Sequence, residues 1–318
     1  DVSYPSVPLF LLYQPELVRG MLRPILKFAK MPVWTYDFAP HDVGRYPILT
    51  GQVYGARQRA KHQAMGITHP PYYLYPATAD AYLLHRQMPV EESADMLLMV
   101  ASCSKADGDY TLAKENLDLL EQWCRYLQEF GNDPGEQLCT DDFAGHLARN
   151  CNLSLKAILG IAAYADLSGD ASMMETAKRM AKDWERDAKA DHAGTRLAFD
   201  KADTWSMKYN MVWDNLLGYG ISSDEVKQNE IRVYTEHMNR YGVPLDSRAT
   251  FTKIDWLMWS TCIWDDKEYF EQICEAIANM LNETTDRVPM TDWYDTHTAE
   301  YHAFINRSVV GGLFINLL

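Results

Sequence analysis

Several features that mark particular classes of protein are missing from this sequence. It contains no run of about 18 or more apolar residues, so it predicts no membrane-spanning helix. Basic residues are the minority, with 30 Lys plus Arg against 44 Asp plus Glu, and the formal charge of −14 argues against a nucleic-acid or anionic-membrane surface. The first residues, DVSYPSVPLF, lack the pattern of a signal peptide, and we expect them to be an internal stretch of a longer exported protein.

Signatures of common catalytic and metal sites are also missing. The chain has no G-x-S-x-G, no H-E-x-x-H and no Gly-rich phosphate loop. The pairs His41 with Asp42 and His297 with His302 lack the helical i, i+4 spacing and the third ligand that a metal site requires. The sequence therefore predicts neither a metal nor another cofactor.

The cysteines follow neither a disulfide pattern nor a zinc pattern. No CxxC pair occurs, and most of the cysteines lie in apolar helical stretches, where Cys behaves as a small hydrophobe. We therefore expect buried free thiols. The six residues are Cys103, Cys124, Cys139, Cys151, Cys262 and Cys274.

What the chain does contain is apolar surface in helical patterns. With 318 residues, 47% of them hydrophobic, it is long enough to bury a large core. Some segments have one polar face and predict partly solvated helices: residues 110–130, 171–188, 224–241 and 267–281. Others are apolar or aromatic on most sides and predict buried helices: residues 91–103, 144–167, 208–218, 253–264 and 306–318.

Because the two kinds of helix alternate, we expect an all-α fold, namely an (α/α)6 toroid in which outer helices surround inner ones. We expect residues 1–318 to form this toroid as one domain. Residues 196–210 have a weak strand pattern, whereas residues 31–88 are rich in Pro, Tyr and Gly and predict a long loop. Structureless loops longer than about 15 residues are usually functional or disordered. The polar face of residues 110–130 is expected to be solvated and without function; its members are Lys114, Asp118, Glu121, Arg125 and Gln128.

Acidic clusters precede the predicted inner helices. In a double ring the inner helices run in the same direction, so their N-terminal ends share one rim and the clusters are expected to converge there. A single Asp before a helix usually caps it, but paired acids beside Trp can also bind and protonate a polar substrate. In LCTDDFAGHLARN, we expect Thr140 or Asp141 to cap the helix and Asp142 to face the cup.

This convergence selects the candidate site residues. The candidate acid–base residues are Glu92, Asp142, Asp246 and Asp255. The candidate substrate-binding residues are His41, Asp42, Glu91, Trp205, Arg248, Trp256, Asp292, Trp293 and Asp295.

Long motifs across the chain resemble one known family. FAPHDVGRYP, PVEESADMLLM, QLCTDDFAGHLARNCNLSLKAILGI, KYNMVWDNLLG, YGVPLDSRATFTKIDWLMW and DWYDTHTA closely resemble the glutaminase A family of fungal extracellular and bacterial proteins. The resemblance implies an α-toroid related to the six-hairpin glycosidases, β-rich N-terminal domains in longer members, and a secreted or periplasmic setting. It also implies the hydrolysis of L-glutamine to L-glutamate and ammonia.

Three functions remain open at this point. An amidohydrolase would bind a small polar substrate, with Arg248 for the α-carboxylate of glutamine, Asp246 or Asp142 for its α-ammonium, and Glu92 or Asp255 as the base. A glycoside hydrolase or carbohydrate-binding toroid would use paired carboxylates between platforms formed by Trp205, Trp256 and Trp293. A structural domain of a larger exported protein would use neither.

Overall fold

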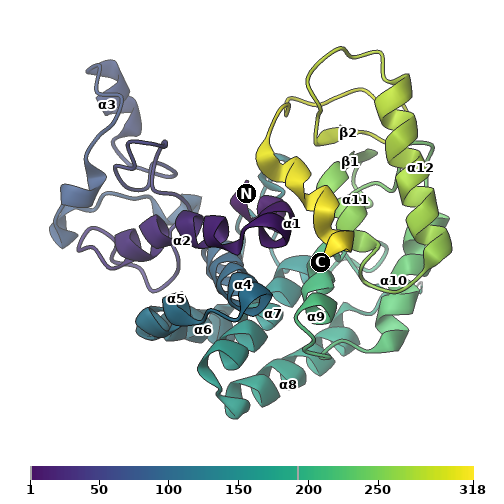
Figure 1. Cartoon of the computed structure of the whole chain (residues 1–318), viewed down its shortest axis with the longest axis horizontal. Helices are drawn as coiled ribbons and strands as arrows, with labels where there is room; N and C mark the ends of the chain where they lie inside the picture. The colour runs from purple at the N-terminus through teal and green to yellow at the C-terminus, as the bar shows by residue number, and fades with distance from the viewer. Residues whose placement is uncertain (1, 192) are drawn as a thin grey trace.

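The computed structural model describes residues 2–191 and 193–318 and shows a closed ring of inner helices (Figure 1). Their cyclic order follows from the contacts of α1 with α4, α4 with α7, α7 with η5, η5 with α11, α11 with η6, and η6 with α1. The inner elements are α1 (Ser3–Tyr13), α4 (Pro89–Asp107), α7 (Cys151–Ser168), η5 (Tyr209–Met211) continued by α9 (Val212–Leu216), α11 (Ile254–Ser260) and the 3₁₀ helix η6 (Ser308–Leu317).

A second layer of helices surrounds this ring. Helix α2 packs on α1 and α4, α6 on α4 and α7, α8 on α7, and α12 on α11. The outer helices are α2 (Pro15–Ala29), α6 (Leu117–Phe130), α8 (Ala171–Ala188), α10 (Asp224–Glu236) and α12 (Lys267–Glu283). The chain is thus the (α/α)6 toroid that the alternating pattern predicts.

The two layers follow from the residue patterns of their helices. In α6 the apolar stripe with Leu120, Trp123 and Leu127 is buried, while Asp118 and Arg125 on the other side are exposed. In α7 nearly every side chain is buried, as its apolar sequence predicts. Burial of such surface stabilises the fold by about 25 cal/mol per Å² of apolar area.

The predicted start of the α7 helix was wrong. We expected a helix from residue 144, but α7 begins at Cys151 because the Asn150 side chain accepts hydrogen bonds from the N–H groups of Asn152 and Leu153. Before it, Gly145 has φ of +84°, a left-handed conformation that interrupts a helix. The residues before Asn150 therefore form a loop with the short 3₁₀ helix η4 (Asp142–Ala144).

The predicted extended segment at residues 196–210 forms no strand; it contains isolated bridges, such as that of Ser206 with Asp246, and runs into η5 at Tyr209. The described strands are instead β1 (Phe251–Lys253) and β2 (Trp293–Asp295). They pair antiparallel, with Thr252 opposite Tyr294. This ribbon was missed because three-residue strands leave almost no periodic signal.

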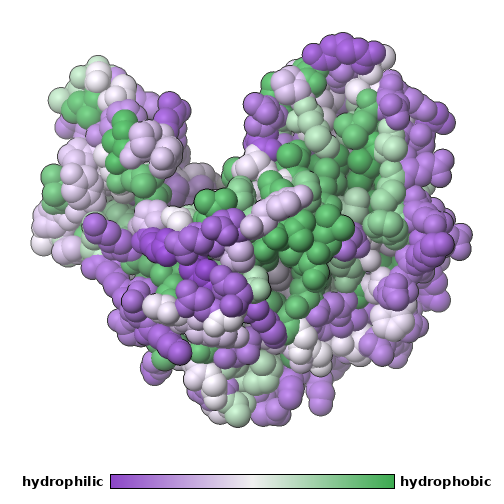
Figure 2. All heavy atoms as spheres, in the orientation of Figure 1, coloured by the Kyte–Doolittle hydropathy of each residue, from purple (hydrophilic) through white to green (hydrophobic). Residues whose placement is uncertain are grey.

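Residues 31–88 form the expected long loop. Their regular structure is limited to α3 (Arg59–Ala64) and the 3₁₀ turns η1 (Tyr72–Leu74), η2 (Ala77–Ala79) and η3 (Leu84–Arg86), and α5 (Thr111–Glu115) comes later, between α4 and α6. The segment builds a lobe on one side of the ring, and the β1–β2 ribbon lies in a second lobe (Figure 1). Figure 2 shows a deep notch between the two lobes.

The expectation of buried free thiols is confirmed in part. All six cysteines are free thiols, but only Cys103, Cys124 and Cys151 are buried, and Cys139, Cys262 and Cys274 are partly exposed. In the part of the chain that the structure describes, no helix is both long enough and apolar enough to span a bilayer.

Candidate active site

The first turns of several inner helices meet at one rim and bond to one another. The Tyr4 hydroxyl of α1 donates to Asn210 Oδ1 in η5 at 2.8 Å and accepts from Trp213 Nε1 of α9 at 2.7 Å. The ammonium of Lys156, from α7, lies 4.0 Å from the centre of the Tyr4 ring. Segments distant in sequence therefore share a polar centre.

A buried ion-pair network forms one side of this centre. Lys156 Nζ lies 2.6 Å from Glu91 Oε1 and 2.8 Å from Asp95 Oδ1 on α4. Glu91 Oε1 also accepts from the backbone N–H of Thr140 at 2.8 Å and from its hydroxyl. Burial raises the pKa of Asp95 to about 7, although Lys156 acts in the opposite direction. Oε1 of Glu91, a predicted substrate-binding residue, is thus already bonded to Lys156 and Thr140.

Asp141 lies in the polar centre, and its predicted capping role was wrong. Asp141 Oδ2 accepts from the Tyr209 hydroxyl at 2.7 Å, and Oδ1 accepts from Trp256 Nε1 at 2.9 Å. Burial raises the pKa of Asp141, and the charge of Lys253 opposes the shift. The side chain of Asp142 lies outside the described part of the structure, so its predicted position in the cup stays a prediction.

Asp255 forms a second ion-pair network at the rim. Lys253 Nζ lies 3.2 Å from both oxygens of Asp255 and 3.1 Å from Asp292 Oδ2. Asp292 is also bound in a two-pronged pair by Arg307. Burial raises the pKa of Asp255 to about 6, with Lys253 lowering and Asp292 raising it. Asp255 thus titrates close to neutral pH, whereas Asp292 is held by two cations.

Glu92 lies next to Glu91 on α4 but has different surroundings. Its side chain is 3% exposed, and Oε1 has no hydrogen-bond partner among the described residues. His41 Nε2, from the long loop, lies 3.9 Å from Oε1. Burial raises the pKa of Glu92 to about 7, and His41 lowers it to a smaller extent. A carboxyl group with this pKa is partly protonated at neutral pH and can act as a general acid.

Asp246 and Arg248 form a tight pair at the edge of the centre. Arg248 donates to Asp246 through Nε at 2.9 Å, Nη2 at 2.7 Å and its backbone N–H at 2.8 Å. Both residues line a small cavity of about 20 Å³ beside Asp141 and also a hollow of about 450 Å³. The carboxylate of Asp246 is therefore engaged with the guanidinium group of Arg248.

The tryptophans predicted as platforms have different surroundings. Trp256 is fully buried and stacks on Tyr209 with ring centres 3.9 Å apart, so it presents no face to a ligand. Trp205 is 8% exposed and stacks on His237 at 4.4 Å. Trp293 is half-buried in an aromatic group with Phe143, Phe251, His302 and Phe304.

Asp295 has a local structural role in the second lobe. It accepts hydrogen bonds from the backbone N–H groups of His297 and Thr298 and from the hydroxyl of Thr250. These bonds close the turn after β2. The structure thus brings Glu92, Asp255, Glu91, Trp256 and Asp292 into the rim, and leaves Asp295 in an exposed turn.

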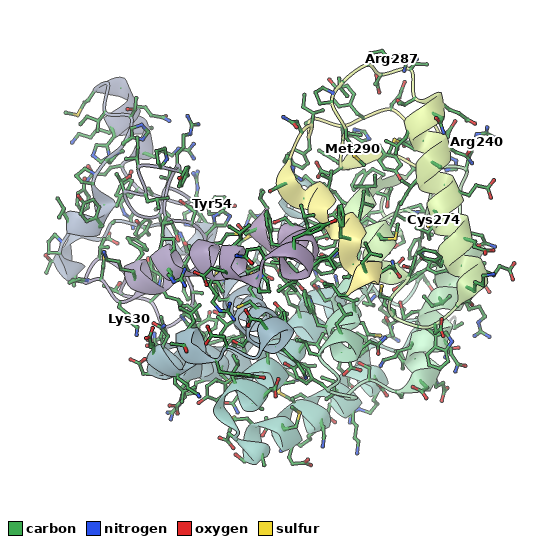
Figure 3. The ribbon with its side chains drawn as sticks, in the orientation of Figure 1. Lys30, Tyr54, Arg240, Cys274, Arg287 and Met290 are labelled. Atoms are coloured by element: carbon green, nitrogen blue, oxygen red, sulfur yellow. The ribbon has the colours of Figure 1, made fainter. Side chains whose placement is uncertain are left out.

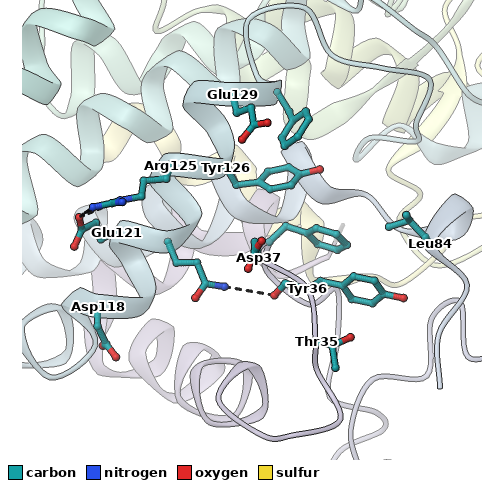
Figure 4. Close-up of a pocket in the computed structure, with 12 residues that line it drawn as sticks. Thr35, Tyr36, Asp37, Leu84, Asp118, Glu121, Arg125, Tyr126 and Glu129 are labelled. Carbon is teal, nitrogen blue, oxygen red and sulfur yellow. Dashed lines mark hydrogen bonds and ion pairs between the residues drawn. The ribbon is translucent and has the colours of Figure 1, made fainter. Parts of the chain in front are cut away.

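A separate hollow of about 770 Å³ lies on the outside of the ring (Figure 4). It is lined by α6 and residues 35–38, and the exposed Arg125–Glu121 pair spans part of its wall. Its aromatic side includes Tyr36 stacked on Phe38 with ring centres 4.9 Å apart. This hollow belongs to the polar outer face and contains none of the buried rim carboxyls.

The rim also contains residues that the sequence argument missed, namely Tyr4, Asp95, Lys156, Lys253 and Arg307. Asp95 and Lys156 each carry a charge inside a helix that is otherwise buried on most sides. A charge in such a helix must be paired when the helix is buried. That rule would have found both residues.

Glu92, Asp95 and Asp255 share one chemical property. Each has a buried carboxyl oxygen without a well-directed hydrogen bond, and the pKa of each is raised by burial. Strongly perturbed carboxyl groups in one region are typical of acid–base sites. In the part of the chain described, no group of three or more His, Cys, Asp or Glu residues is arranged to hold a metal ion.

Fold and site together define an (α/α)6 toroid with titratable carboxyl groups at the rim where the inner helices begin. The chain belongs to the family described as the glutaminase A six helical-hairpin domain, which matches residues 1–317.

Named relatives agree with this membership. The chain is 31% identical to glutaminase A of Aspergillus oryzae over 100% of its own length and 44% of that protein. It is 26% identical to a probable glutaminase of Arthroderma benhamiae over 99% of its own length and 44% of that protein. The chain thus spans less than half the length of these relatives. A cellobiose 2-epimerase from Spirochaeta thermophila matches 94% of this chain and 98% of its own, with 15% identity and a TM-score of 0.48.

Proposed function

We propose that this chain is a hydrolase domain that converts L-glutamine and water to L-glutamate and ammonia. The observation that carries the reaction type is Glu92, a buried carboxyl in the first turn of α4 that has one oxygen without a hydrogen-bond partner and a pKa of about 7. The substrate class rests on the two relatives named as glutaminases.

In this proposal two carboxyls divide the proton transfers. Asp255, with a pKa of about 6, is mostly ionised at pH 7 and takes a proton from the attacking water. The water oxygen adds to the amide carbon, and the C–N bond breaks. Glu92 gives its proton to the departing nitrogen, which leaves as ammonia. Two carboxyls whose surroundings separate their pKa values are the usual basis for such acid and base roles.

The zwitterionic end of glutamine requires one charge of each sign. Arg248 and Asp246 present such a pair in the lining of the hollow of about 450 Å³. Asp141 lines the small cavity beside them and accepts a hydrogen bond from Trp256, which follows Asp255 in the sequence. We propose that Arg248 binds the α-carboxylate and Asp246 the α-ammonium group.

Glycoside hydrolysis is the second candidate. It also uses two carboxyls, one as acid and one as base or nucleophile. The same raised pKa values of Glu92 and Asp255 suit it. The buried position of Trp256, however, removes one of the three tryptophan platforms that this function would use.

The purified chain incubated with L-glutamine and, separately, with a panel of glycans would distinguish these functions. We expect ammonia without new reducing ends, loss of ammonia release in Glu92→Gln, and unchanged release in Glu121→Gln. Glu121 is the matched control because it lies on the outer face in an exposed ion pair. Reducing ends without ammonia would establish the glycosidase instead, and neither product would favour a structural domain.

A further inference from the structure

The last inner helix, η6, packs closely against two other inner helices. It contacts α1 and α11, and Figure 3 shows this C-terminal helix lying beside both. Two adjacent glycines of η6, Gly311 and Gly312, are buried. Neither has a positive φ, so the backbone itself would accept another residue at either position. What excludes a side chain there is the closeness of the neighbouring helices.

Gly312 packs directly on the candidate base. A Cβ atom added at Gly312 would lie 2.8 Å from Cβ of Asp255, 2.9 Å from the carbonyl oxygen of Pro5 and 3.0 Å from Nε1 of Trp259. Asp255 and Trp259 are four residues apart on α11, so they lie on the same side of that helix. The backbone of η6 thus supports the side of α11 from which the Asp255 carboxyl projects.

The atoms around Gly312 have little freedom to make room. The Cβ atom of Asp255 and the oxygen of Pro5 move only with their own helices. Trp259 is fully buried and packs on Trp256 with ring centres 4.9 Å apart. Carbon atoms pack best about 3.5–4.0 Å apart, so an added methyl group would separate η6 and Asp255 by at least about 0.7 Å more.

A displaced Asp255 would lose part of its ion pair. Both of its oxygens lie 3.2 Å from Nζ of Lys253. The same Nζ lies 3.1 Å from Oδ2 of Asp292, which Arg307 also binds, so the ammonium group is held from a second side. Because 3.2 Å is already a close contact, displacement of Asp255 lengthens it. Lys253 lowers the pKa of Asp255, so a longer distance raises that pKa.

We propose that Gly312 is a positioning residue that holds Asp255 where it can take a proton from the attacking water. This inference rests on the proposed function, in which Asp255 is the base. Gly312 touches no reacting atom and acts only through Asp255. A misplacement of about 1 Å in a catalytic group can lower a rate about 10²-fold. Helix η6 is therefore part of the site, although its sequence, SVVGGLFINL, contains no titratable side chain.

Gly311 provides a matched control. A Cβ atom added there would lie 2.9 Å from the carbonyl oxygen of Ser6 and 3.0 Å from Cβ of Leu9, both on α1. Gly311→Ala therefore crowds η6 about as severely as Gly312→Ala does, but away from Asp255. A purely structural role of Gly312 would give the two variants the same properties.

The first test follows the proton on Asp255 without any activity. The difference in unfolding free energy between a protein with Asp255 and its Asp255→Asn counterpart is measured from about pH 4 to about pH 8, and its midpoint reports the titration of Asp255. We expect a higher midpoint in the Gly312→Ala background than in the wild type, and an unchanged midpoint in Gly311→Ala. A midpoint that is not raised in Gly312→Ala, or is raised equally in both backgrounds, would overturn the proposal.

A second variant keeps this test possible if Gly312→Ala does not fold. Combining it with Trp259→Phe removes the indole nitrogen, one of the three close contacts, while the added methyl group still presses on Cβ of Asp255. The reference is then Trp259→Phe alone. The midpoint should again be higher in the double variant, and equal midpoints would refute the positioning role.

The third measurement is ammonia release from glutamine. We expect Gly312→Ala to lower kcat about 10- to 10²-fold with little change in KM, because the base is displaced, and Gly311→Ala to keep the kcat of the wild type. Equal kcat values in the two variants would refute the proposal. If the wild-type chain releases no ammonia, the proposed function fails, while the titration still decides whether Gly312 positions Asp255.

Discussion

Replacing Glu92 by Gln should make the protein more stable and less active. Burial raises the pKa of Glu92 from 4.5 to about 7, so the folded state favours the neutral acid. A group with a raised pKa adds stability below its unfolded pKa, and this contribution is lost as the pH rises through the folded value. Gln has nearly the same shape and cannot ionise, so the variant should not lose stability as the pH rises through this range.

The size of the effect follows from the two pKa values. The ionisation of Glu92 lowers the free energy of unfolding by about 1 kcal/mol at pH 5 and by about 3 kcal/mol at pH 8, at 1.36 kcal/mol per tenfold change in proton affinity. Glu92→Gln should therefore be more stable than the wild type at pH 8, by at most that amount. Its advantage should shrink toward pH 5.

Urea unfolding of both proteins at the two pH values, with Glu121→Gln as the control, measures this difference. Ammonia release from glutamine should fall about 10²- to 10⁴-fold in the same variant, as expected for loss of a general acid. If the difference in unfolding free energy between Glu92→Gln and the wild type is the same at pH 5 and pH 8, burial does not keep the Glu92 carboxyl neutral. Unchanged turnover would remove Glu92 from the mechanism.

The remaining predictions concern the other networks. Asp255→Asn should lower turnover about 10²- to 10⁴-fold. The residual rate of the variant should no longer decrease as the pH is lowered through about 6, because the group that titrates there is gone. A residual rate that still decreases at acid pH would show that another residue is the base. Lys156→Met should cost about 3–5 kcal/mol in chemical unfolding, because Glu91 and Asp95 would remain buried without a counter-charge; a cost below about 1 kcal/mol would show that the carboxyls simply take up protons. Glu121→Gln should change stability by less than about 0.5 kcal/mol, since it breaks one exposed pair, and a loss of ammonia release would show that the outer face has a function.

The sequence predicts the ring because the relevant signal is local and repeated. Helix α6 has a single apolar stripe, which ends at Leu127 and requires burial of one side of the helix. Helix α7 is apolar on most sides and requires burial all round. Alternation of the two kinds of helix then leaves few architectures. The loop character of residues 31–88 follows in the same way from its Pro and Gly content.

The site was harder to predict because partner choice depends on distances between segments far apart in sequence. Asp141 and Asp142 are adjacent and chemically alike, yet Asp141 bonds Tyr209 and Trp256, and the helix cap belongs to Asn150. Nothing in the acid pair itself distinguishes these roles. Such assignments require the positions of the donors, which the fold alone supplies.

The dependence of kcat/KM on pH for ammonia release from glutamine tests the central claim most directly. We expect activity to rise through about pH 6 as Asp255 ionises and to fall above about pH 7 as Glu92 loses its proton. The alkaline fall should disappear in Glu92→Gln and the acid rise in Asp255→Asn. A wild-type profile without these two limbs, or one that both variants retain, would contradict the assignment of acid and base to this rim.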